Sequence, residues 1–182
     1  MKLPTAITLT RIFFIPIFVA LFYLPFNWAY IATAIIFVLA AITDWLDGFL
    51  ARKLEQTSRF GAFLDPVADK LMVVIALVLL VGSHKTPFMT LPALVIVGRE
   101  VVISALREWM AELGKSINVA VNFIGKIKTT LQFIAIILLL LQPLHYNFIA
   151  LLGYVFLYAA ALLTLWSMLV YLKAAWPDFE FK

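Results

Sequence analysis

The sequence predicts an all-α integral membrane protein, folded as a bundle of six transmembrane helices. The first observation is composition, because 65% of the 182 residues are hydrophobic and the mean hydropathy is +1.06, whereas a soluble domain is about half apolar. The second is that the chain divides into six apolar stretches, each close to the ~20 residues that a helix needs to cross a bilayer core. The third is that these stretches are joined by short connections, which favours one compact bundle.

The expected spans follow the apolar stretches in order along the chain. They lie near residues 8–26, 29–50, 61–82, 89–111, 122–142 and 147–172. Short turns at 24–27, 82–87 and 142–147 separate three pairs of neighbouring spans on one side of the bundle. Because no internal repeat or linker interrupts the pattern, we expect a single transmembrane domain over residues 1–182.

Basic residues predict the orientation of the bundle. One set of helix ends carries Lys2, Arg11, Arg52, Lys53, Arg59, Arg107, Lys115, Lys126, Lys128, Lys173 and Lys182, whereas the opposite turns carry only Lys85. The positive-inside rule then places both termini in the cytoplasm. The formal charge of +4 is explained by this topology, and we expect no nucleic-acid partner because the chain lacks a basic surface interleaved with aromatic residues. The absence of cysteine excludes disulfides and cysteine-ligated metals.

Four aspartates carry the chemistry in this sequence. Asp44 and Asp47 are three residues apart, and Asp65 and Asp69 are four apart, so each pair occupies one face of a helix. The short connection between these helices lets antiparallel neighbours bring the four carboxylates together at the cytoplasmic boundary. Carboxylates beside an apolar environment demand compensating cations, and ligand sets made only of oxygen suit Mg²⁺ or Mn²⁺. Two divalent ions would balance the four charges, in an arrangement used for phosphoryl transfer.

A different class of protein uses similar residues. In ion-coupled transporters, carboxylates inside the membrane bind ions or relay protons. Here the acids cluster toward one end of the bundle rather than at its middle, which favours an enzyme. The transporter nevertheless stays the alternative from another class.

The acidic residues belong to a longer motif, D-x2-D-G-x2-A-R-x8-G-x3-D-x3-D, which runs from Asp44 to Asp69. This string resembles the signature of the CDP-alcohol phosphotransferase family and matches it at every fixed position. Further similarity covers residues 3–11, 98–115 and 125–130. The resemblance implies six transmembrane helices, a polar cavity open to the cytoplasm, and a homodimer. The similarity to bacterial members implies a location in the cytoplasmic (inner) membrane.

The same resemblance implies an activity and a set of site residues. The activity is transfer of a phosphatidyl group from CDP-diacylglycerol to glycerol 3-phosphate, which gives phosphatidylglycerophosphate and releases CMP. The resemblance assigns two metal ions to Asp44, Asp47, Asp65 and Asp69, and CDP-diacylglycerol to Gly48, Ala51, Arg52, Gly61 and Thr8. Asp69 would also be the general base. Attack by an alcohol needs a proton acceptor within hydrogen-bond reach, but the residues alone do not choose among the four acids.

An acceptor phosphate would need cationic partners outside the metal site. Arg107, Lys126 and Lys128 lie near the cytoplasmic ends of the fourth and fifth spans and are predicted to bind it, although such residues also serve topology. Arg99 lies about midway along its span, where an arginine needs a partner or a water-filled cavity. We expect Glu100 to pair with Arg99, and we include Arg99 in the predicted acceptor pocket.

Two further expectations concern this pocket. Lys70 follows Asp69 but is rotated about 100° around the helix, so we expect it to reach the membrane interface or to support the site indirectly. The same chemistry with serine, inositol phosphate or phosphatidylglycerol as acceptor stays open. A neutral or zwitterionic acceptor would not require Arg107, Lys126 and Lys128 together, which favours glycerol 3-phosphate.

Overall fold

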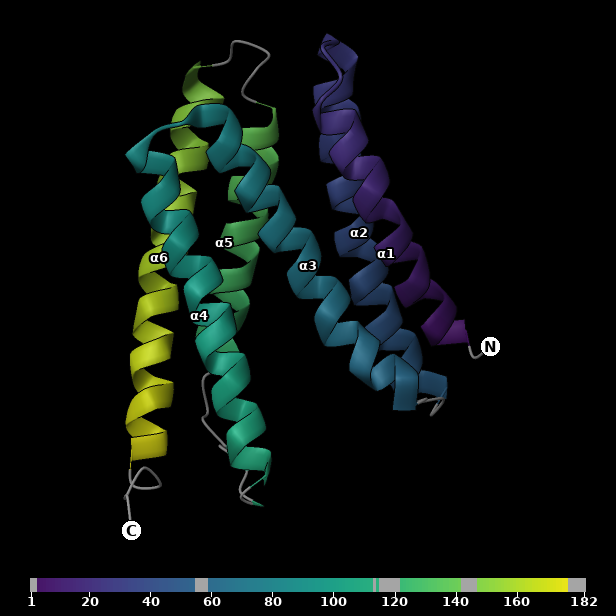
Figure 1. Ribbon diagram of the computed structural model, residues 1–182, viewed down its shortest axis with the longest axis vertical. Helices are drawn as coiled ribbons and strands as arrows, with labels where there is room; N and C mark the ends of the chain where they lie inside the picture. The colour runs from purple at the N-terminus through teal and green to yellow at the C-terminus, as the bar shows by residue number, and fades with distance from the viewer. Residues whose placement is uncertain (1–2, 55–58, 113, 115–121, 142–146, 177–182) are drawn as a thin grey trace.

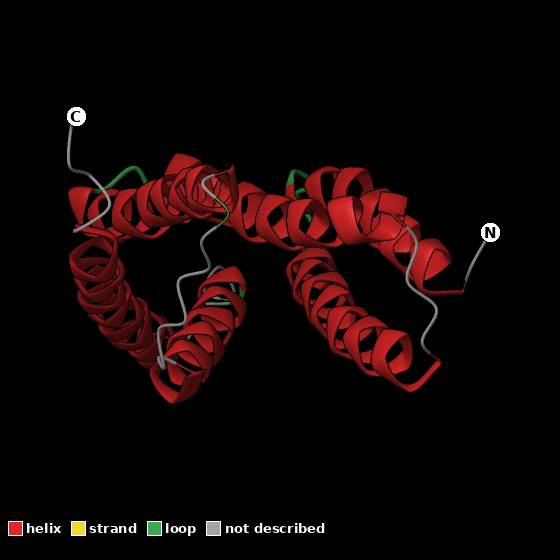
Figure 2. Cartoon of the chain, turned by 90° about the horizontal axis from the view of Figure 1, so that it is seen from below, coloured by secondary structure: helices red, strands yellow, loops and turns green. Residues whose placement is uncertain are grey.

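The computed structural model describes residues 3–54, 59–112, 114, 122–141 and 147–176. Within these ranges only the helical backbone is described for residues 3–8, 44–54, 59–66, 69, 122–124 and 147. The described chain consists of helices and the turns that join them, as Figure 2 shows, and it contains no strand. The predicted all-α class is therefore confirmed.

Six helices follow the predicted spans in number and order. They are α1 (Leu3–Phe22), α2 (Asn27–Leu54), α3 (Arg59–His84), α4 (Pro87–Glu112), α5 (Asn122–Leu140) and α6 (Asn147–Ala175). The C-terminal ends of two helices differ by four residues from the predicted spans: α2 continues to Leu54 rather than ending at residue 50, and α1 ends at Phe22 rather than at residue 26. The chain turns there, with the amide of Leu24 donating to the carbonyl of Leu21 at 3.2 Å, and Pro25 has no amide proton with which to continue the helix.

The helices run alternately up and down, as Figure 1 shows. α1 packs against α2, and α6 packs against both α4 and α5. α3 crosses between these two groups and contacts α1, α2, α4 and α5. The start of α1 and the end of α6 lie toward the lower end of the bundle in this view, so the helix ends that carry most of the basic residues are gathered on one side.

Large apolar side chains remain exposed on every helix. Examples in chain order are Phe13, Ile35, Val78, Leu94, Ile134 and Trp166. Soluble proteins rarely expose large contiguous apolar patches, so this surface fits a lipid environment. α4 and the Phe148–Ala175 part of α6 are long and apolar enough to cross a membrane. The described apolar parts of α1, α2 and α3 are shorter, and six crossings stay a prediction.

The buried core joins helices from both groups. Phe37 of α2 is central, with its ring centroid 6.1 Å from that of Phe18 in α1 and 5.5 Å from that of Phe133 in α5. A second, smaller cluster joins α4 to α6 through Ile103 and Ala175. Phe37 and Phe133 also line the cavity described below, so the core that holds the helices together also forms part of its wall.

Candidate active site

The acidic motif occupies the end of α2 and the beginning of α3. Asp44 and Asp47 lie in α2, and Asp65 and Asp69 lie in α3. At a rise of about 1.5 Å per residue, Asp47 and Asp65 are each about 10 Å along the helix axis from the connected ends, and Asp44 and Asp69 about 15 Å. The backbone therefore places the two pairs at matching depths on contacting helices.

The side chains of these four aspartates lie outside the described residues. Among the side chains that are described, no group of three or more His, Cys, Asp or Glu residues could hold a metal, and the predicted ligands were not among those searched. The same holds for the residues predicted to contact CDP-diacylglycerol. Gly48, Ala51 and Arg52 are in α2, Gly61 is in α3 and Thr8 is in α1, each with a helical backbone.

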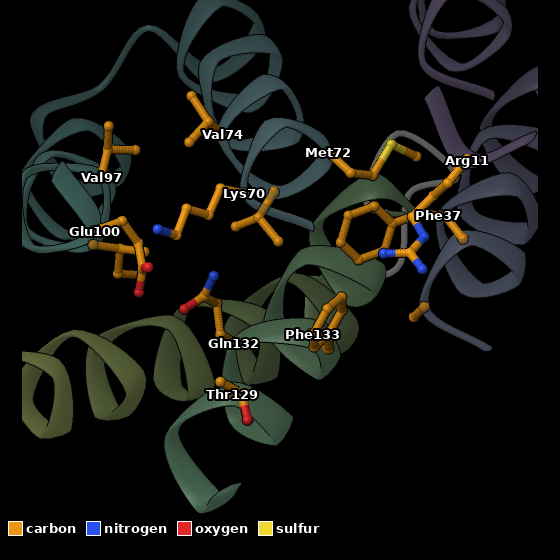
Figure 3. A pocket seen from close by; sticks show the side chains of 14 residues that line it. Arg11, Phe37, Lys70, Met72, Val74, Val97, Glu100, Thr129, Gln132 and Phe133 are labelled. Atoms are coloured by element: carbon orange, nitrogen blue, oxygen red, sulfur yellow. The ribbon is translucent and has the colours of Figure 1, made fainter. Parts of the chain in front are cut away.

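A cavity of about 250 Å³ lies beside the acidic motif. It is lined by residues of five helices, among them Arg11 of α1, Ala41 of α2, Lys70 of α3, Glu100 of α4 and Gln132 of α5. Figure 3 shows Lys70, Glu100 and Gln132 grouped around one part of the cavity, and Arg11 beside Phe37 and Phe133 at another. Because Ala41 is one turn before Asp44 and Lys70 directly follows Asp69, the cavity lies near the backbone of one residue of each acidic pair.

An ion-pair network centres on Glu100 in the cavity wall. Its Oε1 accepts a hydrogen bond from Nη1 of Arg99 at 2.8 Å and from Nζ of Lys128 at 3.4 Å. Arg99 is 9% exposed and Lys128 is 3% exposed. The predicted pairing of Arg99 with Glu100 is confirmed, and the second cation comes from another helix. Among the side chains that the structure describes, two buried cations thus share one carboxylate, and this group carries an excess of positive charge.

A third cation joins this group through Ser104. The ammonium of Lys70 donates to Oγ of Ser104, and this hydroxyl donates to the main-chain carbonyl of Glu100 at 2.6 Å. Sequence reasoning gave Lys70 only an indirect or interfacial role, whereas the structure places it in the cavity wall. The position of α4 relative to α3 decides this, and the sequence next to Asp69 carries no signal for it.

The other predicted acceptor residues lie farther toward the end of the bundle. Arg107 is exposed; its Nη2 donates to the hydroxyl of Tyr171 at 3.0 Å, and its guanidinium carbon lies 5.3 Å from the ring centroid. The guanidinium carbon of Arg99 lies 6.0 Å from the same centroid. Tyr171 therefore links two predicted phosphate-binding arginines to α6. Lys126 is exposed on α5. The structure describes no side-chain contact between Lys126 and Arg99, Arg107 or Tyr171.

Comparison of the sequence with known proteins identifies the family of this chain. The family model described as CDP-alcohol phosphatidyltransferase matches residues 1–166. The chain belongs to the CDP-alcohol phosphatidyltransferase family. The resemblance predicted from the acidic motif is therefore confirmed. The match to the CDP-alcohol phosphatidyltransferase family includes every predicted site residue and every described residue that lines the cavity, whereas Tyr171 follows the matched segment.

Relatives within the CDP-alcohol phosphatidyltransferase family are similar over almost the whole chain. A protein of Pseudomonas fluorescens is 58% identical over 182 residues, covering 99% of this chain and 93% of its own. Proteins of Yersinia enterocolitica and Sodalis glossinidius are 57% and 56% identical over 178 residues, covering 98% of this chain and 97% of their own. All three are named CDP-diacylglycerol–glycerol-3-phosphate 3-phosphatidyltransferase.

Proposed function

We propose that this chain transfers the phosphatidyl group of CDP-diacylglycerol to glycerol 3-phosphate, giving phosphatidylglycerophosphate and CMP. The observation that carries the proposal is the similarity to relatives named for this reaction, at 58% and 57% identity over 99% and 98% of the chain. The acidic motif and the basic cavity beside it supply the residue types that the reaction needs.

The reaction exchanges one phosphorus–oxygen bond for another. A hydroxyl oxygen of glycerol 3-phosphate attacks the phosphorus that carries the diacylglycerol. A new ester bond forms, the bond to the phosphate of CMP breaks, and the hydroxyl proton passes to a base. Asp69 is the proposed base, because its position in α3 directly precedes Lys70 in the cavity wall and a carboxylate can accept this proton.

The four aspartates fit a site for two divalent cations. Their backbone positions match in depth on contacting helices, and an all-carboxylate set suits Mg²⁺ or Mn²⁺. The proposed ligands are Asp44, Asp47, Asp65 and Asp69. When bound, such ions polarise phosphoryl oxygens and stabilise the charge on the leaving CMP. The residues proposed to bind CDP-diacylglycerol are Gly48, Ala51, Arg52, Gly61 and Thr8, where the small residues allow close approach of a phosphate to the backbone.

The acceptor phosphate is proposed to bind at the basic cluster. Arg99 and Lys128 supply two buried positive charges for the single carboxylate of Glu100, and Lys70 adds a third on the cavity wall. A dianionic phosphate would balance the excess through charge-assisted hydrogen bonds. Arg107 and Lys126 complete the proposed set near the end of the bundle. This excess positive charge favours glycerol 3-phosphate over serine, and it would stabilise the binding of a neutral acceptor less.

The location and assembly of the protein form part of the same proposal. The chain is a single domain that crosses the bacterial inner membrane six times, with both termini in the cytoplasm. The gathering of basic helix ends on one side of the bundle supports this orientation. We also propose a homodimer, on the family resemblance alone.

An acceptor panel tests the proposed reaction. Purified protein in detergent is supplied with CDP-diacylglycerol labelled in the cytidine, and CMP release is measured with each acceptor in turn. We expect release with glycerol 3-phosphate and much slower release with serine, inositol phosphate or phosphatidylglycerol. Faster release with one of these would reassign the acceptor. No release with any acceptor, together with ion uptake by liposomes that contain the protein, would favour a transporter.

A further inference from the structure

Glu100 occupies an unusual place in the cavity wall. A single oxygen of its carboxylate contacts cations from α4 and from α5, at 2.8 Å and 3.4 Å. Within the described part of the chain it is the carboxylate that forms ion pairs with these cations. The other described acids of α4, Glu108 and Glu112, are exposed and lie two or more turns farther along the helix.

The main chain of the same residue organises a third cation. The carbonyl oxygen of Glu100 accepts from Ser104, and Ser104 accepts from the ammonium of Lys70 on α3. Contacts through one residue therefore locate cationic groups from three helices. Figure 3 shows Lys70 directed toward Glu100 across one part of the cavity.

Arg99 and Lys128 would repel each other without the carboxylate. Both are buried, and removing one partner of a buried ion pair leaves an uncompensated charge that is strongly unfavourable. Long side chains relieve such a cost by extending toward water. Without Glu100 we therefore expect both side chains to leave the positions that they hold beside the cavity.

We propose that Glu100 is a positioning residue for the acceptor subsite, holding Arg99 and Lys128 in the geometry that receives the phosphate of the acceptor. This inference rests on the proposed function. It assigns the carboxylate no contact with substrate and no proton transfer. A simpler role, in which Glu100 only neutralises charge, makes the opposite prediction. In that case its removal would increase the positive charge of the cavity and strengthen phosphate binding.

Steady-state kinetics of Glu100→Ala and Glu100→Gln distinguish these roles. We expect Glu100→Ala to raise the KM for glycerol 3-phosphate about tenfold or more, the effect of losing roughly one charge-assisted hydrogen bond. The KM for CDP-diacylglycerol should change much less. Glu100→Gln keeps the shape and one acceptor oxygen, so its effect should be intermediate. Glu108→Gln removes an exposed acid from the same helix and serves as the matched control, with both KM values unchanged.

A double variant separates positioning from damage to the fold. Lys128→Met removes the cation that Glu100→Ala leaves without its carboxylate. If Glu100 acts by holding Lys128, both substitutions remove the same contribution of Lys128 to phosphate binding. The double variant should then raise the acceptor KM by less than the product of the two single increases. Melting temperatures in detergent identify variants that fail to fold, in which case Glu100→Gln and its pairing with Lys128→Met carry the test.

Three results would overturn the proposal. They are an unchanged or lowered acceptor KM in a folded Glu100→Ala protein, an equal rise in the KM of both substrates, and fully multiplicative effects in the double variant. Failure of the proposed function is recognised separately, because the wild-type protein would then release no CMP that depends on glycerol 3-phosphate.

Discussion

The packing of α5 against α6 makes a quantitative prediction at Gly153. This buried glycine of α6 lies against α5, and a Cβ atom added to it would be 2.9 Å from Cγ of Leu139, 3.0 Å from its Cδ2 and 3.3 Å from Cβ of Leu138. Real Cβ atoms essentially never approach another heavy atom as closely as the first of these distances. Cγ of Leu139 and Cβ of Leu138 lie within two bonds of the α5 backbone, and the Cδ2 methyl belongs to a side chain that is fully buried. Leu139 therefore has little room to turn away, and α5 and α6 would have to separate.

The expected cost follows from two opposing effects. Gly153→Ala gains about 0.5–1 kcal/mol from reduced backbone entropy in a helix, whereas forcing an extra carbon into a packed interface costs about 1–3 kcal/mol. We expect overpacking to win, with a net loss of about 1–2 kcal/mol. For a chain of this size each kcal/mol shifts the Tm by about 2–4 °C, so the Tm should fall by about 2–8 °C.

This shift in Tm is measured by thermal unfolding in detergent, with size-exclusion chromatography used to monitor the loss of folded protein. The matched control is Gly98→Ala in α4, where no described atom outside the adjoining part of its own helix lies within 4 Å of the added Cβ, and the helix gain of about 0.5–1 kcal/mol should appear alone. A Gly153→Ala protein as stable as the wild type, with the control also unchanged or raised, would show that the α5–α6 contact is looser than described here.

Three further predictions concern the site. Exhaustive chelation should abolish CMP release and Mg²⁺ or Mn²⁺ should restore it, since four carboxylates without other ligand types bind hard cations; full turnover after chelation would exclude the metal site. Asp69→Asn should lower kcat about 10²–10⁴-fold, the usual effect of losing a general base. CDP-diacylglycerol binding is measured in parallel, and near-normal turnover would place the base elsewhere. Arg107→Ala should raise the acceptor KM about tenfold to a hundredfold, and Tyr171→Phe, which keeps the ring and loses the hydroxyl, should raise it less. Equal effects of the two substitutions would contradict the role given to Arg107.

The helices were predictable because apolar length and turn residues are local properties. The observed helix ends differ from the predicted ones where the chain turns, as at Phe22. A hydropathy pattern does not show where the last helical hydrogen bond forms. The pairing of Arg99 with Glu100 was also predictable, since the residues are adjacent and an arginine in the middle of a span requires a partner.

Contacts between helices were not predictable in the same way. Lys128 of α5 reaches Glu100 of α4, and Lys70 of α3 reaches Ser104 of α4. Both contacts depend on how α3, α4 and α5 are placed around one another, for which no local spacing gives a signal. The convergence of Asp44 and Asp69 stays a prediction, because the structure describes their backbone and not their side chains.

The arrangement of α6 has a practical consequence for measuring motion in this protein. None of the described residues that line the cavity belongs to α6, and Leu162, Trp166 and Leu169 are exposed along its outer surface. The chain has no cysteine. A double variant with Leu162→Cys in α6 and Phe13→Cys in α1, both at exposed positions, would therefore accept two spectroscopic labels without background reaction. The distance between the labels would report whether the two helical groups on either side of α3 move apart as substrates bind and products leave.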